Sequence, residues 1–288
     1  MNTNKKALDD RIKEYEREYE KKVPEDFHIM IRIDGHKFSK FTKGFIKPFD
    51  FILSETMRRT AIELMKEFGA ITGYTQSDEI TLLIPSLKDN TIDNREKEKH
   101  KIDKRIKKGW KHIYNGRVMK IASLVASFTA MKFNEILKEE LKSHDLEKEY
   151  VKKIQKKVNK AYFDARVFGV SNETEVLNTF LFRTRDAEKN SKSVFSQTFV
   201  EHKKLQKLNG EEQIELCKKE TGEDWDNIPK RYKYGIFIKR EQIEKEIPKE
   251  FLKYHKNVKN VKRTIFNSSY FKLSYSEENI DFLMRKYK

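Results

Sequence analysis

The stretch Phe27-His-Ile-Met-Ile-Arg-Ile-Asp34 carries an isoleucine at every second position. Successive side chains of a β-strand point to opposite faces of the sheet, so Ile29, Ile31 and Ile33 share one face. Asp34 ends the run on the opposite face and is followed by a glycine. The pattern predicts a buried strand that delivers a carboxylate to one edge of a sheet.

Outward from this strand, helical and strand-like patterns alternate along the chain. The predicted elements are a charged helix at 3–22, a helix at 50–68 capped by Asp50, two strands that flank a turn at 76–79, a helix at 115–142 capped near Asn115, and a strand at 162–170. Without the leading helix the order is β-α-β-β-α-β. This order is typical of a ferredoxin-like split βαβ sheet, so we predict an α+β fold.

The second part of the chain gives a different pattern. A helix is predicted from Thr174 onward, and Tyr234–Ile238 is the one strand candidate before the aromatic stretch Phe266–Tyr275. That stretch fits either core or a strand at an oligomer interface, and core is the favoured interpretation. We therefore predict a catalytic domain at 1–170, with a charged insertion at 86–112, and a mainly helical part at 171–288 packed on it.

The overall composition points to a polyanionic partner. The 288 residues include 62 basic and 46 acidic ones, a net charge of +16. Such a surplus favours nucleic acid, because each Lys or Arg that neutralises a phosphate releases a counterion. Cys217 is the only cysteine, which excludes an intrachain disulfide. No apolar run is long enough to span a bilayer and the N-terminus lacks a signal-peptide core, so we predict a cytoplasmic protein.

Two acidic motifs fall at positions that the predicted sheet brings together. Asp34 ends strand one, and Ser77-Asp78-Glu79 lies at the turn that opens strand three. Strands one and three are neighbours at the centre of a split βαβ sheet, so Asp34 and Asp78 should converge. Two converging carboxylates suit a two-magnesium phosphoryl-transfer site, with the metals roughly 3.5–4 Å apart. Gly35 would let backbone and ligand approach closely.

Other classes of protein remain open at this point. Each motif alone is also common in ordinary turns. RNA-recognition modules share the split βαβ sheet, but they read bases with aromatic residues on strands one and three, where this chain has Arg32, Asp34, Asp78 and Glu79. Carboxylates there would repel RNA unless metal ions neutralised them, which favours catalysis. A nucleotide cyclase would share the site but leaves the second half of the chain unexplained.

Basic residues near the predicted site could bind a triphosphate. Lys43 and Lys47 follow strand one, Arg117 and Lys120 lie one turn apart at the start of the long helix, and Arg183 and Arg185 lie on the later helix. The N-terminus of a helix also favours anions. The seven histidines show no metal-ligand spacing, so a zinc site is not expected. The chain has no P-loop, Rossmann glycine motif or nucleophile elbow.

These residues and several further motifs resemble the tRNA-His guanylyltransferase family, above all its branch of guanylyltransferase-like proteins that act as 3′-to-5′ RNA polymerases. The matching segments span roughly residues 7–240: Asp10-Arg11, Arg32-Ile33-Asp34-Gly35, Lys47-Pro48-Phe49-Asp50, Tyr74-Thr75-Gln76-Ser77-Asp78-Glu79, Gly116-Arg117-Val118, Phe163-Asp164-Ala165-Arg166, Arg183, Asp186-Ala187, Asn190-Ser191, His202-Lys203 and Trp225 to Pro229. Together they are specific, although each alone is modest.

The resemblance implies a polymerase-like palm fold and a set of roles. Asp34 and Asp78 would bind two Mg²⁺ ions, with the Gly35 carbonyl as a further ligand, and Glu79 would orient the site. Lys47 would contact the incoming triphosphate. The remaining candidates for binding nucleotide or the phosphates of the tRNA 5′ end are Arg32, Ser77, Arg117, Lys120, Arg183, Asp186 and Asn190.

The resemblance also implies a reaction on tRNA. ATP or GTP would activate the 5′-phosphate, and the 3′-hydroxyl of a second nucleoside triphosphate would attack it. The tRNA-His enzymes of eukaryotes carry His-Ile-Asn-Asn where this chain has Lys189-Asn190-Ser191-Lys192, and Ser39 replaces a common family histidine. These departures favour templated repair of tRNA 5′ ends over guanylate addition to tRNA-His, which stays the alternative. Family members are commonly homotetramers.

Overall fold

The computed structural model describes residues 7–86, 111–246 and 260–285. Its centre is one six-stranded sheet with the order β4-β1-β3-β2-β5-β6, in which every neighbouring pair is antiparallel. The strands are β1 (His28–Gly35), β2 (Thr72–Gln76), β3 (Glu79–Ile84), β4 (Phe163–Val170), β5 (Ile236–Glu246) and β6 (Asn260–Ser269). The first four have the β4-β1-β3-β2 order of a split βαβ sheet, which confirms the prediction of an α+β fold with β1 beside β3.

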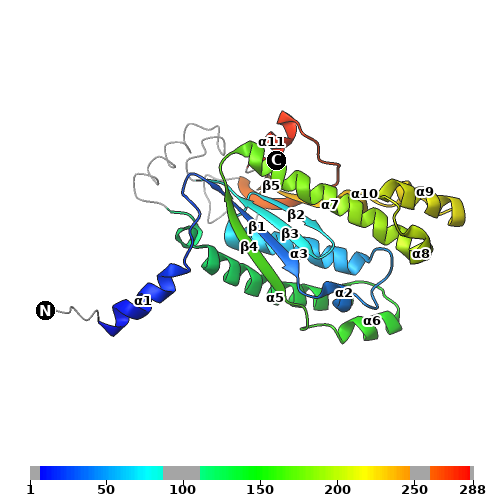
Figure 1. The fold of residues 1–288 in the computed structure, drawn as a ribbon, viewed down its shortest axis with the longest axis horizontal. Helices are drawn as coiled ribbons and strands as arrows, with labels where there is room; N and C mark the ends of the chain where they lie inside the picture. The colour runs from blue at the N-terminus through cyan, green and yellow to red at the C-terminus, as the bar shows by residue number, and fades with distance from the viewer. Residues whose placement is uncertain (1–6, 87–110, 247–259, 286–288) are drawn as a thin grey trace.

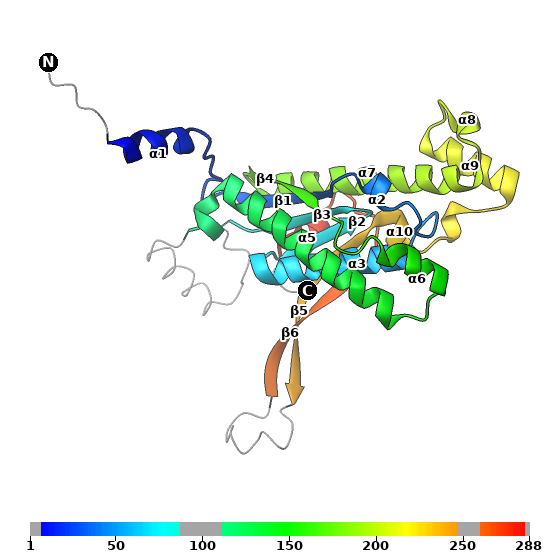
Figure 2. The ribbon, with the colours of Figure 1, turned by 90° about the horizontal axis from the view of Figure 1, so that it is seen from below.

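Helices cover both faces of the sheet (Figures 1 and 2). On one face α3 (Phe51–Phe68) and α5 (Val118–Ser143) pack against the isoleucines of β1, all of which are fully buried. On the other face Met30 packs with α7 (Glu173–Phe199) and α11 (Glu277–Met284). The alternation seen in β1 therefore divides two hydrophobic cores, as a period of two requires.

Shorter elements complete the chain. They are α1 (Leu8–Glu18), α2 (Phe38–Phe41), the 3₁₀ turn η2 (Ile113–Gly116), α6 (Lys148–Gln155), α8 (His202–Leu205), α9 (Gly210–Thr221), the 3₁₀ turn η3 (Trp225–Asn227) and α10 (Lys230–Tyr234). Every residue of α1 is exposed, and Figure 2 shows this helix projecting from the body. Within the described part of the chain, no helix is both long and apolar enough to cross a membrane.

Several predicted boundaries change for physical reasons. The long helix begins at Val118 rather than 115, because Asn115 has a left-handed backbone (φ 59°) inside η2 and does not cap it. Asp50 does cap α3, accepting a hydrogen bond from the Leu53 amide at 2.9 Å. The strand predicted at 234–238 runs from 236 to 246, because it pairs with β6 from Phe237 to Glu246.

The second part of the chain contributes to the same sheet as the first. β5 pairs with β2, and β6 extends the sheet beyond β5. Within the stretch Phe266–Tyr275, Phe271 and Leu273 pack in the core beside α7 and α11, which confirms the core interpretation for them. The predicted insertion 86–112 falls almost wholly outside the described residues. The division at residue 170 stays a prediction.

Candidate active site

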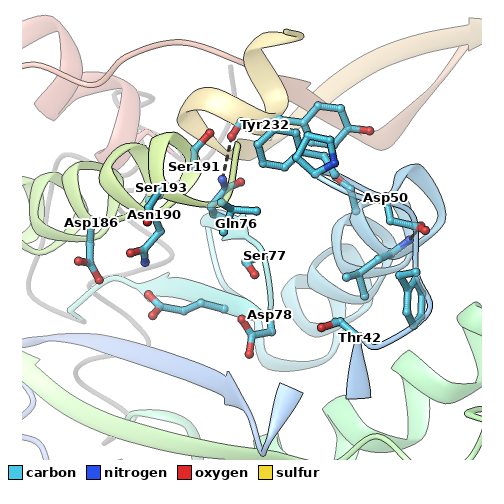
Figure 3. A pocket seen from close by; sticks show the side chains of 18 of the residues that line it. Thr42, Asp50, Gln76, Ser77, Asp78, Asp186, Asn190, Ser191, Ser193 and Tyr232 are labelled. Carbon is cyan, nitrogen blue, oxygen red and sulfur yellow. Dashed lines mark hydrogen bonds between the residues drawn. The ribbon is translucent and has the colours of Figure 1, made fainter. Parts of the chain in front are cut away.

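The turn between β2 and β3 brings the two predicted carboxylates into one cavity. Asp34 stands opposite Glu79 in the β1–β3 ladder, and Ser77 takes a left-handed backbone (φ 54°) that makes the turn tight. Asp34 and Asp78 both line a cavity of about 460 Å³. Figure 3 shows the side chains of Ser77 and Asp78 projecting into this region from the turn. The predicted convergence of Asp34 and Asp78 is confirmed.

The carboxyl group of Asp78 lies in an unfavourable place for a negative charge. Burial raises the pKa of Asp78 to about 6, and the negative charges of Asp34 and Glu79 add to the rise. Hydrogen bonds from the Asp78 amide and the Ser77 hydroxyl offset part of it. A cation placed between Asp34 and Asp78 would relieve this repulsion.

Glu79 is held between two arginines. Arg32 approaches its carboxylate at 2.7 and 2.8 Å from β1, and Arg183 approaches it at 3.2 Å from α7. Arg183 is 7% exposed and Glu79 18%, so these charges meet in a partly dry environment. Glu79 therefore ties the third strand to α7 and fixes both guanidinium groups. Arg32 also lies 4.0 Å from the Asp34 carboxylate. The orienting role of Glu79 stays a prediction.

Packing by itself requires a glycine at position 35. A Cβ at this position would lie 2.2 Å from the Phe38 ring. Phe38 is 4% exposed and packs against Phe41, Phe133 and Phe163. The glycine thus lets the first turn after β1 fold back onto the core, which differs from the reason given by the sequence. Its predicted carbonyl contact with a metal stays a prediction.

One wall of the cavity is a single face of α7. Arg183, Asp186, Asn190 and Ser191 line it there, as Figure 3 shows for the last three. Arg183, Asp186 and Asn190 are spaced by three and four residues, as one helix face requires, and Ser191 directly follows Asn190. Among the predicted nucleotide-binding residues, Arg183, Asp186 and Asn190 therefore lie together with Ser77.

The opposite wall is the loop before α3, which carries Lys47. Asp50 organises this loop: its carboxylate accepts hydrogen bonds from the Ile46 amide at 2.8 Å and from the Tyr150 hydroxyl at 2.7 Å, besides capping α3. Lys47 is thereby held on the wall facing α7. The sequence identified Asp50 only as a cap, because its second role depends on a tyrosine 100 residues away.

Two predicted phosphate ligands lie elsewhere. The backbone of Arg117 bridges to Lys22, just before β1, and its side chain pairs with Glu20. Lys120 lies over the ring of Tyr114, with its ammonium 5.4 Å from the ring centre. This is the opposite end of β1 from Asp34, about 20 Å away by the rise of a strand. The expectation that they lie near the carboxylates is wrong within one copy of the chain.

A second cavity of about 400 Å³ adjoins the first and shares Arg32 and Arg183 with it. Arg166 from β4 adds a third guanidinium, and the exposed rings of Phe168 and Phe182 complete its rim. The Thr81 hydroxyl lines it too and is buried without a hydrogen-bond partner among the described residues. Three guanidinium groups outnumber the one carboxylate of the lining, Glu175, and together with the unpartnered hydroxyl they are suited to an anionic ligand.

The donor set fits magnesium rather than a softer metal. Within residues 7–86, 111–246 and 260–285 there is no group of three or more His, Cys, Asp or Glu side chains placed to hold a metal. Mg²⁺ does not need one, because it commonly takes one or two carboxylates and completes its shell with phosphate oxygens and water. Asp34 and Asp78, beside a cavity lined by cations, meet that requirement.

Comparisons of the sequence with known proteins find two matches. Residues 9–171 match the model of the tRNAHis guanylyltransferase family. An uncharacterised protein of Acanthamoeba polyphaga mimivirus, R259, is 34% identical over 289 positions, covering 97% of this chain and 90% of its own.

Solved structures of bacterial tRNA(His) guanylyltransferase-like proteins share the fold. One, in complex with ATP, is 33% identical with a TM-score of 0.65, covering 81% of this chain and 88% of its own. Another, in complex with GTP, is 28% identical with a TM-score of 0.64, covering 96% and 98%. The Saccharomyces cerevisiae tRNA(His) guanylyltransferase is 22% identical with a TM-score of 0.58, covering 78% and 91%, and supports the fold alone.

Proposed function

This chain belongs to the tRNAHis guanylyltransferase family, and from that premise we propose that it adds nucleotides to the 5′ end of tRNA in the 3′-to-5′ direction. Each added nucleotide is selected by pairing with the opposing base of the tRNA 3′ strand. The observation that carries the proposal is the pair Asp34 and Asp78 in one cavity lined by Lys47, Arg32 and Arg183. Carboxylates for metal and cations for phosphate are the parts that phosphoryl transfer requires.

The proposed reaction has two steps. The tRNA 5′-phosphate attacks the α-phosphorus of ATP or GTP, forming a phosphoanhydride and releasing pyrophosphate. The 3′-hydroxyl of a second nucleoside triphosphate then attacks the activated 5′-phosphorus, forming a phosphodiester and releasing the nucleoside monophosphate. The new 5′ end carries a triphosphate. Catalysis of both steps depends on positioning the reacting groups and on stabilising negative charge.

Asp34 and Asp78 would hold two Mg²⁺ ions, with the Gly35 carbonyl as a further ligand. Bound magnesium would supply charge neutralisation for the triphosphate and a lower pKa for the attacking hydroxyl. The protein's own part is to bring both carboxylates to one cavity, to which the tight turn at Ser77 contributes.

The cations have separate proposed tasks. Lys47 contacts the incoming triphosphate from the loop before α3, while Ser77, Asp186 and Asn190 position it from the turn and from α7. Arg32 and Arg183, shared by both cavities, connect the reacting centre to the second cavity. We assign the second cavity to the phosphates of the activating nucleotide or of the tRNA 5′ end, because three arginines line it and two of them also line the cavity of Asp34 and Asp78.

The α7 sequence favours templated repair over guanylate addition to tRNA-His. Asn190 and Ser191 line the cavity, and Ser191 accepts a hydrogen bond from the Trp225 indole at 3.0 Å. Lys192 is buried in ion pairs with Glu188 at 3.0 Å and Glu211 at 2.5 Å. Lys192 therefore joins α7 to α9 and is not available to read a particular base.

The test is a tRNA that lacks its first 5′ nucleotide, incubated with Mg²⁺, ATP and each nucleoside triphosphate in turn. Extension only by the nucleotide complementary to the opposing 3′-strand base, lost in Asp34→Ala and Asp78→Ala, is the expected result. Addition of G whatever the opposing base would establish the tRNA-His reaction instead. Binding without addition, on both 5′-monophosphate and 5′-triphosphate tRNA, would leave an RNA-binding protein.

Two accompanying proposals concern the assembly of the protein, which the family suggests, and its location, which the sequence suggests. A homotetramer would explain how Arg117 and Lys120, remote from the cavity within one copy, could serve phosphates at another copy's site. Sedimentation at several concentrations tests this assembly, and a monomer at all of them contradicts it. The cytoplasmic location stays a prediction, checked by imaging the tagged full chain.

A further inference from the structure

The first cavity continues along α7 well beyond the carboxylates. Its lining on this helix runs from Arg183 to Gln197, about 20 Å at the rise of an α-helix. Charged groups lie at the Arg183 end, where Glu79 and Asp186 meet it. Ser193, Val194 and Gln197 line the other end, and none of them carries a charge. On its α7 side the cavity thus changes from ionic to neutral along its length, while Lys47 and Asp50 line the side that faces it.

Two aromatic rings face this neutral end. Phe49, from the loop before α3, stacks on Tyr232 of α10 with ring centres 4.9 Å apart and planes 8° from parallel. Phe49 packs on the small core that includes Phe195, which places it beside the later turns of α7. The Tyr232 carbonyl accepts a hydrogen bond from the Gln76 amide at 3.0 Å, drawn in Figure 3, and this bond ties α10 to the metal-site turn.

These rings differ from the other aromatic residues on the cavity wall. Four aromatic side chains among the described residues line it. Phe45 is 5% exposed and packs against Phe41 and Tyr150, and Tyr74 is 2% exposed. Phe49 and Tyr232 are only half-buried. Of the four rings they have the most surface left for a ligand, and the Arg231 guanidinium lies 5.8 Å from the centre of the Tyr232 ring.

We propose that the Phe49–Tyr232 stack is the wall of a nucleobase subsite in this cavity. A nucleotide with its phosphates beside Lys47 and the carboxylates would place its base at the neutral end, against these rings. Ser193 and Gln197, joined by a hydrogen bond from the amide nitrogen to the hydroxyl at 2.9 Å, supply uncharged polar groups for the edge of the base. The inference rests on the proposed function, which places phosphates at the ionic end.

The base could belong to a free nucleoside triphosphate or to a nucleotide of the RNA, and the chemistry of recognition is the same. Stacking on an aromatic residue requires a flat face rather than bulk. The decisive variants are therefore Tyr232→Leu, which keeps volume without a π-face, and Tyr232→Phe, which keeps the face. Phe51→Ala is the matched control, because this exposed ring lies two residues from Phe49 but does not line the cavity.

Calorimetric titration of the full chain with Mg²⁺ and either GTP or inorganic tripolyphosphate tests the subsite. We expect Tyr232→Leu to weaken GTP binding about 10- to 100-fold while tripolyphosphate binding stays within about twofold, and both Tyr232→Phe and Phe51→Ala to behave as the parent. If GTP binding is unchanged but binding of the 5′-truncated tRNA weakens by the same factor, the base belongs to the RNA.

Other results overturn the inference. Equal losses for GTP and tripolyphosphate would mean that Tyr232 only supports the fold of the cavity, and no loss for GTP or tRNA would mean that the rings contact no base. Failure of the proposed function gives a different result. In that case the parent protein itself would bind neither tripolyphosphate nor GTP in the presence of Mg²⁺.

Discussion

Replacing Asp78 by Asn should make the metal-free protein more stable while it removes activity. The pKa of Asp78, raised to about 6 by burial and by the charges of Asp34 and Glu79, exceeds the ordinary 3.8 of an aspartate. At 1.36 kcal/mol for each pH unit, the charged carboxylate costs the fold about 3 kcal/mol above pH 6. Asn keeps the shape but loses part of the hydrogen bonding, so we expect a gain of about 1–3 kcal/mol.

The sign of the pH dependence follows from the same pKa. Between pH 3.8 and pH 6 the folded state binds more protons at Asp78 than the unfolded state does, so the parent loses stability as pH rises through this window. The advantage of the variant should be absent below pH 3.8, should grow up to about pH 6 and then stay constant. At pH 8 it corresponds to a melting temperature higher by about 3–10 °C.

Thermal melts in chelator across pH 4–8 provide the measurement, with a parallel series in Mg²⁺. Mg²⁺ should raise the melting temperature of the parent and leave that of Asp78→Asn unchanged, because a ligand stabilises only the state that binds it. Asp164→Asn is the control: Asp164 stands opposite Asp34 on β4 but is exposed, so its change should stay within about 0.5 kcal/mol. A variant less stable than the parent at pH 7–8 in chelator would refute the idea of an uncompensated charge at Asp78.

Three further changes test the surroundings of the site. Glu79→Gln should lower the free energy of unfolding by about 2 kcal/mol or more, because it leaves the Arg32 and Arg183 guanidinium groups without their shared anion. Denaturant unfolding measures this loss, and an unchanged midpoint would mean that the ion pairs are not formed. Gly35→Ala should lower the free energy of unfolding by about 1–3 kcal/mol, because the added Cβ pushes the Phe38 ring out of place. Adding Phe38→Leu should recover part of that loss in the same assay, whereas additive losses in the double variant would contradict the clash. Lys239→Met should lower the free energy of unfolding by about 2 kcal/mol, because the fully buried Lys239 ammonium donates hydrogen bonds to the Thr72 hydroxyl at 2.6 Å and to carbonyls at the end of α11. The amides of α11 should exchange hydrogen faster in this variant. Exchange as slow as in the parent would contradict the anchoring role of Lys239.

Local patterns in the sequence determined most of the sheet and identified the two carboxylates that converge on the first cavity. The alternation around Ile31 identified β1 and its two faces, and Asp50 identified the start of α3. Because a split βαβ sheet has only one arrangement for its first and third strands, the meeting of Asp34 and Asp78 followed from strand order alone. Periodicity and strand order are properties that neighbouring residues carry, so they can be read along the chain.

Only the tertiary structure decided which side chains complete the site. Tyr232 reaches the cavity from a five-residue helix, Arg183 pairs with Glu79 across 104 positions, and Arg117 lies at the far end of β1 although its helix packs under the same sheet. No local pattern encodes these relations, because each depends on where two distant elements pack and on the direction in which a helix crosses the sheet. The charges available for catalysis were therefore visible in the sequence, but their pairing was set by packing.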